Sequence, residues 1–234
     1  MNSVAEGASR APALNILALA GAGTGNVKST AAVNLALAFA AAGLRVELRD
    51  LDPAAAAFTA LGGAAEPGGG PVELAISRAL RGRVAVATGL PPVERADAAP
   101  DLVLLDCPQR ADAVTEQALA LARIVLVPVD ASPLAFRALG DVAGALARQA
   151  PDAARLRVAL ARVLPRRIDR WGVVEEITER YPGALYVTTV PLRRTGASPH
   201  ADARTPTLYA PTTRAAAAYS ALALEVADDL GIRS

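Results

Sequence analysis

The sequence predicts an α/β fold, in which a mostly parallel, twisted sheet carries helices on both faces. Short continuous apolar runs alternate along the chain with segments whose apolar residues recur at helical spacing. Such alternation predicts right-handed βαβ units and therefore parallel strands. Strands that are apolar on both sides are typical of a sheet with both faces covered. A glycine-rich stretch at 21–28 lies between the first apolar run and the first helical segment.

The expected elements follow from these patterns. The apolar runs predict strands at 15–20, 44–49, 84–88, 102–105, 124–129, 156–163 and 185–190. Helical spacing predicts helices at 29–42, 71–80, 113–122, 133–149, 169–181 and 212–230. Gly43 is expected to end the first helix. Residues 1–13 are expected to form a flexible N-terminus, and residues 14–234 a single domain.

Composition excludes several classes of protein. The chain has 234 residues, of which 53% are hydrophobic, and its formal net charge is +1. No global field therefore favours nucleic acid or an anionic membrane. The only cysteine, Cys107, excludes an internal disulfide and a cysteine-ligated cluster within one chain. No signal peptide pattern and no apolar run of ~20 residues is present, so a cytoplasmic location is expected.

The chain uses one lysine, Lys28, and otherwise only arginine as its basic residue. Lysine is a compact point charge on a flexible stem, whereas arginine is a planar fork. Chance survival of one lysine is the alternative explanation. The position of Lys28 at the end of the glycine-rich stretch favours a functional role.

The glycine-rich stretch has the placement of a phosphate-binding loop. The start of a helix offers free N–H groups and the positive end of the dipole, and glycines let the backbone approach phosphate oxygens. Lys28 would reach the β- and γ-phosphates, and the Ser29 hydroxyl would bind Mg²⁺. The candidate nucleotide-binding residues are Gly23, Thr24, Gly25, Asn26, Val27, Lys28, Ser29 and Thr30. For this stretch alone, a simple glycine-rich turn remains an alternative, because Ala22 and Val27 replace both glycines of G-x-x-x-x-G-K-[ST].

Three carboxylates strengthen the phosphate-loop interpretation. Asp50 and Asp52 follow the second predicted strand, and Asp106 follows the strand predicted at 102–105. Carboxylates at the carboxyl edge of a parallel sheet, beside a phosphate loop, are placed to act on Mg²⁺ and water. Each alone would be interpreted as a solvated acid at a strand end. Their order and spacing together favour a nucleotide site.

Several motifs resemble those of the ParA/MinD family of deviant-Walker ATPases. K-S-T-A-A-V-N-L-A at 28–36 is similar to the family's K-T-T-x-A-V-N-L-A, and D-L-D-P at 50–53 to its D-x-D-P. The residues at 101–108 resemble its Walker B strand and the start of switch II. Further similar segments are G-L-R-V at 43–46, V-L-V-P-V at 125–129, and the C-terminal stretches 189–194 and 219–225.

The resemblance implies a P-loop domain that uses ATP and Mg²⁺. It assigns the phosphates to Lys28, Mg²⁺ to Ser29 and Asp106, and the attacking water to Asp52, with Asp50 in support. Family members sandwich two ATP molecules between two subunits. The ATP-bound dimer then binds DNA or membrane, and hydrolysis releases it.

The chain departs from the family in its loop. Gly23 stands where the family has a signature lysine that reaches the partner's ATP, and Thr24 replaces the glycine that follows. A missing cation of this kind predicts slow hydrolysis. If the loop needed φ > 0 at Val27, a β-branched residue would be strongly disfavoured, unless the loop turns at Gly25 and Asn26 instead. Two functions therefore stay open, a slow partition ATPase and a pseudo-ATPase that binds a partner without turnover.

The expected partners are a second copy of the chain, DNA, and an adaptor. The C-terminal stretch is short and acidic, so no membrane anchor is expected. The resemblance to ParA-type members implies non-specific DNA binding through basic residues near the C-terminus, here Arg193, Arg194, Arg204 and Arg214. Solvated surface charge is the alternative for these residues. The resemblance further implies a ParB-like or cargo adaptor protein, nucleoid association, and a role in plasmid or chromosome partition.

Overall fold

A computed structural model describes residues 14–21, 27–53, 57, 61, 71–73, 80–91, 99–109, 112–130, 132–149, 155–163, 170–191 and 212–232. The strands are β1 (Ile16–Leu19), β2 (Arg45–Asp50), β3 (Val72–Glu73), β4 (Arg83–Thr88), β5 (Leu102–Asp106), β6 (Ile124–Val129), β7 (Arg155–Val163) and β8 (Leu185–Pro191). The helices are α1 (Val27–Ala41), α3 (Ala113–Leu121), α4 (Pro133–Gln149), α5 (Arg170–Arg180) and α7 (Arg214–Leu230).

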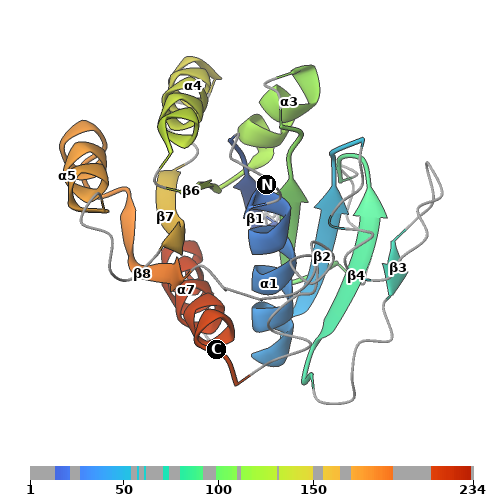
Figure 1. Cartoon of the computed structure of the whole chain (residues 1–234). Coiled ribbons are helices and arrows are strands. Elements are labelled where there is room, and N and C mark those ends of the chain that lie inside the picture. Colours follow the sequence, from blue (N-terminus) through green and yellow to red (C-terminus); the bar gives the residue numbers. More distant parts are fainter. Residues whose placement is uncertain are drawn as a thin grey trace, which may run out of the picture.

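The strands form one sheet in the order β3-β4-β2-β5-β1-β6-β7-β8. Every neighbouring pair is parallel except β3 and β4. Helices α1 and α7 cover one face, and α3, α4 and α5 cover the other (Figure 1). The predicted fold class, a mostly parallel sheet between two helical layers, is confirmed.

Two apolar cores lie on opposite faces of the sheet. In β1, Leu17 and Leu19 face the core under α1, whereas Ile16 and Ala18 face the other. This alternation follows from the two-residue period of a strand. Helix α1 is buried along nearly its whole length, because it packs between the sheet and α7. Its alanines have small side chains, which allow this close double packing.

The predicted strands agree with the structure to within two residues at each end, as do all predicted helices except one. The helix predicted at 71–80 is wrong at its start, because Val72 and Glu73 form β3. Val72 pairs with Val86 and Glu73 with Ala85 in an antiparallel arrangement. The open edge of β4 offers backbone hydrogen bonds to a β-branched residue, and this tertiary pairing overrides the local helical spacing. Residues 74–79 lie outside the described part of the chain.

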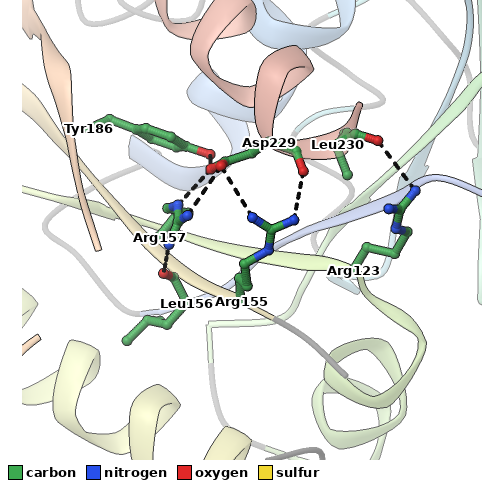
Figure 2. Close-up of polar contacts among 7 residues, drawn as sticks. All are labelled: Arg123, Arg155, Leu156, Arg157, Tyr186, Asp229 and Leu230. Carbon is green, nitrogen blue, oxygen red and sulfur yellow. Dashed lines mark hydrogen bonds and ion pairs between the residues drawn. The ribbon is translucent and has the colours of Figure 1, made fainter. Parts of the chain in front are cut away.

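The last turn of α7 is tied to the sheet through the Asp229 carboxylate (Figure 2). Arg157 donates to it from Nε at 2.6 Å and from Nη2 at 3.2 Å, and the Tyr186 hydroxyl donates at 2.8 Å. The Arg157 guanidinium also lies 5.9 Å from the centre of the Tyr186 ring. Hydrogen bonds from Arg157, followed by the bond from Tyr186 and the charge of Arg157, hold the pKa of Asp229 below its usual value.

Two further arginines bind the final carbonyl groups of α7 (Figure 2). Arg155 donates from Nη2 to the Asp229 carbonyl at 2.9 Å, and Arg123 donates from Nη1 to the Leu230 carbonyl at 3.3 Å. These carbonyls have no partner within a helix, and cations near them also favour the helix dipole. The amino ends of β6 and β7 therefore hold the C-terminus of α7, which packs along α1.

Replacement of Asp229 by asparagine is expected to lower the free energy of unfolding at pH 7. The change keeps the shape of the side chain but removes the charge that Arg157 and Arg155 bind. Hydrogen bonds to charged groups contribute about 1.5–3 kcal/mol each, so a loss of about that size is expected in urea denaturation. Asp228→Asn is the matched control, because Asp228 is exposed and lies next in the chain.

The difference between wild type and Asp229→Asn should depend on pH. Because folding lowers the pKa of Asp229, its contribution is complete above the unfolded value of about 3.9. It should disappear as the pH falls through the still lower folded value. A difference that stays constant down to pH 2 would show that the carboxylate charge is not what holds α7.

Candidate functional site

The carboxyl ends of the central strands converge at one edge of the sheet. Asp106 pairs in register with Leu19 of β1 and with Asp50 of β2, so both carboxylates lie at the level where β1 ends. The backbone is held there by bonds from Cys107 N to the Leu19 carbonyl at 3.0 Å and from Leu51 N to the Asp106 carbonyl at 2.9 Å. This is the edge at which parallel α/β sheets bind ligands.

Lys28 and Asp106 meet at this edge although 78 residues separate them. Lys28 Nζ lies 3.1 Å from Asp106 Oδ1 and also donates to the carbonyl oxygen of Cys107. The exposed fraction of the side chain is 9% for Lys28 and 0% for Asp106. Helix α1, which follows β1, thus directs the single lysine to the end of β5, where the sequence predicts the metal carboxylate.

The environment of Asp106 opposes its charge. Burial raises the pKa of Asp106 to about 6, against the opposing effects of the Lys28 ammonium and the Ser29 hydroxyl. The nearby charge of Asp50 contributes to this rise. Asp106 Oδ2 is buried and has no hydrogen-bond partner among the described residues.

These donors fit a magnesium ion. A buried carboxylate oxygen with its lone pairs unused, beside a serine hydroxyl, offers the hard oxygen ligands that Mg²⁺ prefers. Within the described residues, no group of three or more His, Cys, Asp or Glu side chains could hold a metal by itself. Such a site agrees with Mg²⁺, which usually binds one or two protein oxygens together with phosphates and water.

Asp50 and Asp52 lie differently at the end of β2. Asp50 is 2% exposed, and its Oδ1 accepts a hydrogen bond from the Asp52 backbone at 3.1 Å. This local bond closes a turn typical of aspartate. Asp52 is partly exposed, so solvent reaches it. Asp50 therefore shapes the turn that presents Asp52 at the surface.

The chain leaves β1 through a strained backbone position. Gly21 has φ +109°, and a Cβ built there would lie 3.0 Å from Val127 Cγ1. Only glycine suits such a position. The sequence pattern places Gly21 in the loop, but the prediction did not include this requirement. The signal was present, since it is the first glycine after an apolar strand.

Val27 is the first residue of α1 and is 5% exposed. A helical residue has negative φ, which β-branched side chains accept. The difficulty that φ > 0 would cause at Val27 therefore does not arise in this structure. Lys28, Ser29 and Thr30 follow in the first turn of α1. Gly23, Thr24, Gly25 and Asn26 lie outside the described residues.

Arg49 is a residue near the site that the sequence-based prediction did not include. Its side chain is 8% exposed, and Nη2 lies 2.5 Å from Glu47 Oε1. Nη1 donates to the carbonyls of Gly89 at 3.1 Å and Leu90 at 3.0 Å, which fixes the turn after β4. The signal was a glutamate and an arginine two residues apart in a strand, which share a face and can pair.

Of the arginines assigned to DNA, only Arg214 lies in the described part of the chain. It is exposed in the first turn of α7, after the N-cap Thr213. Arg193, Arg194 and Arg204 lie outside the described residues. None of the described helices is both long enough and apolar enough to cross a bilayer.

Comparison with known proteins identifies relatives over most of the chain. Residues 17–197 match the CobQ/CobB/MinD/ParA nucleotide-binding domain. The chain is 34% identical over 237 residues to the chromosome-partitioning ATPase Soj of Thermus thermophilus, with 90% of this chain and 94% of Soj covered.

Solved structures share the fold at low identity. A chain of the MinC:MinD cell division protein complex of Aquifex aeolicus superimposes with a TM-score of 0.70 at 16% identity, covering 92% of this chain and 96% of that chain. Cobyrinic acid a,c-diamide synthase from Mycobacterium smegmatis, with bound ADP and magnesium, gives 0.68 at 21%, covering 91% and 94%. A plasmid partition protein from Borrelia burgdorferi gives 0.67 at 13%, covering 92% and 98%.

Proposed function

Because the chain belongs to the CobQ/CobB/MinD/ParA family of nucleotide-binding domains, we propose that it is a ParA-like ATPase that dimerises on ATP. Its task is to position or segregate plasmid or chromosomal DNA, or another large cargo, through nucleotide-dependent, non-specific DNA binding. The observation that carries the proposal is the buried contact between Lys28 and Asp106 at the carboxyl edge of the sheet. That contact joins a phosphate-binding cation to a metal-binding carboxylate.

ATP and Mg²⁺ are the cofactors. Lys28 binds the phosphates, with Thr30 and the loop 23–27 around them, while Ser29 and Asp106 hold the metal. When bound, Mg²⁺ neutralises charge that develops on the transferred phosphoryl group. The free N–H groups at the start of α1 face the same phosphates, since they have no partner within the helix.

Asp52 orients the attacking water, and Asp50 holds the turn that carries it. Support comes from their placement, since Asp50 is buried against the turn and Asp52 is reached by solvent. Gly23 supplies no cation to the partner's ATP, so turnover is slow. That same residue favours the alternative, a pseudo-ATPase that keeps the fold and a partner surface but does not hydrolyse ATP.

Dimerisation would turn weak DNA contacts into a switch. The chain has a net charge of +1, so its overall charge gives one subunit little attraction to DNA. Two subunits joined by ATP present two sets of arginines at once, and avidity can then exceed either set by orders of magnitude. Association with the nucleoid follows from this binding, and a ParB-like or cargo adaptor would link it to the cargo.

The test is DNA retention across a salt series with ATP, with ADP, and without nucleotide. With ATP, binding should be sequence-independent, and log affinity should fall with log salt because phosphate contacts release counterions. Arg193→Ala combined with Arg194→Ala should flatten the salt slope by about two contacts per subunit and weaken binding, without altering ATP affinity.

Arg148→Ala is the matched control, since Arg148 is an exposed arginine in the last turn of α4, at the amino edge of the sheet. It should retain the wild-type slope. Binding that ignores nucleotide state, or that survives the double change, would overturn the dimer switch. Absence of binding in every state would assign the cargo to a protein partner.

A further inference from the structure

We propose that the Lys28 ammonium neutralises Asp106 until a phosphate draws it away, so that Mg²⁺ enters the site with or after the nucleotide and not before it. This inference rests on the proposed function of the site. Under this proposal the ammonium group of Lys28, the single lysine of the chain, occupies two alternative positions. In one position Lys28 neutralises Asp106, and in the other it binds phosphate.

The first step is the contact itself. Lys28 Nζ lies 3.1 Å from Asp106 Oδ1 and donates to the Cys107 carbonyl. The side chains of Lys28 and Asp106 are both at least nine-tenths buried. A divalent cation that approached Asp106 would meet an ammonium group at hydrogen-bond distance from the same carboxylate. Like charges this close repel strongly where water is excluded. The ammonium must therefore leave before the carboxylate can bind a metal.

The second step is that the carboxylate is only half satisfied by Lys28. Asp106 Oδ2 is buried without a hydrogen-bond partner among the described residues. An unused oxygen on a buried carboxylate is costly, and it fits a ligand that arrives later. Ser29, the next residue after Lys28, places its hydroxyl beside the same carboxyl. The oxygen ligands of the metal site are therefore in place, but the Lys28 ammonium opposes the binding of a cation to them.

The third step is what moves the ammonium. Lys28 lies in the first turn of α1, where free N–H groups favour an anion. A polyphosphate bound there offers the ammonium a new counter-charge, and Asp106 is then free to accept the metal. Charge is balanced on both sides of the exchange. Lysine suits this role because its stem is flexible and its charge compact, whereas arginine would form a fixed fork.

The direct experiment measures Mn²⁺ binding by electron paramagnetic resonance in the absence of nucleotide. Wild type should bind no Mn²⁺ at this site at millimolar metal. Lys28→Gln keeps a donor for the Cys107 carbonyl but removes the charge, so it should bind Mn²⁺ at least ~10-fold more tightly than wild type. The double variant Lys28→Gln with Asp106→Asn should lose the gain. Equal Mn²⁺ binding by wild type and Lys28→Gln would overturn the proposal.

A second measurement needs no lysine variant and covers the case in which Lys28→Gln does not fold. Asp106→Asn releases Lys28 from its ion pair. In excess EDTA, the variant should therefore bind metal-free ATP several-fold more tightly than wild type does. The variant should bind Mg-ATP more weakly than wild type. Asp50→Asn is the control for the general loss of a nearby buried negative charge, because Asp50 is also buried while the ion pair of Lys28 is formed with Asp106. Equal gains in the two variants would overturn the proposal.

The inference and the proposed function can fail separately. If wild type binds Mg-ATP but Lys28→Gln gains no Mn²⁺ affinity, the nucleotide site stands and the exchange is wrong. If wild type binds no ATP but Lys28→Gln gains Mn²⁺ affinity that Asp106→Asn removes, Lys28 still guards a metal site, and the ATPase function is wrong.

Discussion

Lys28→Ala is expected to weaken Mg-ATP binding by about 10²–10⁴-fold. The ammonium makes charge-assisted contacts with two phosphates, each of about 1.5–3 kcal/mol, and every 1.4 kcal/mol is tenfold in affinity. Its loss also leaves the buried Asp106 charge without its ion partner, which repels the incoming phosphates. Isothermal titration calorimetry of wild type and variant measures the effect.

The change is severe, so folding must be checked. Removing one partner of a buried pair can destabilise a protein by about 3–5 kcal/mol. Circular dichroism should show that Lys28→Ala retains its helices, and Lys28→Gln serves if it does not. Arg137→Ala, an exposed residue of α4, is the control and should bind ATP as wild type does. Equal affinity of Lys28→Ala and wild type would remove Lys28 from the phosphate site.

Asp52→Ala is expected to lower ATP turnover by about 10²–10⁴-fold while ATP still binds. This range is typical for the loss of a side chain that positions or deprotonates a reacting water. Binding should persist because Asp52 is assigned to the water and not to the phosphates. Phosphate release from wild type and variant, measured with and without DNA, gives the comparison. Asp52→Asn tests whether the charge, and not only the hydrogen bond, is needed.

The two open functions diverge in this assay. Slow turnover in wild type that disappears in Asp52→Ala supports an ATPase. Undiminished turnover in the variant would remove Asp52 from the mechanism. No turnover in wild type, with DNA or an adaptor present, would favour the pseudo-ATPase, for which Gly23 is the sequence feature.

The central strands β1 and β6 were predicted well because they are continuous apolar runs, and 124–129 agrees with β6 at both ends. The segment 71–80 failed because an edge strand of two residues depends on its neighbour and leaves little local pattern. The role of Arg49 was not predicted from the sequence for a related reason. Its role depends on the turn after β4, which is 39 to 41 residues further along the chain.

The sequence by itself determined that a helix beginning directly after Lys28 follows the first strand and that Asp50 and Asp106 stand at strand ends. Parallel βαβ connections bring such ends to one edge, so nearness in space follows from local patterns. Only the tertiary structure decided that β5 lies between β2 and β1, and that the Lys28 ammonium contacts Asp106 Oδ1 and the Cys107 carbonyl. Strand order and side-chain contacts depend on pairings between distant segments, which no local period encodes.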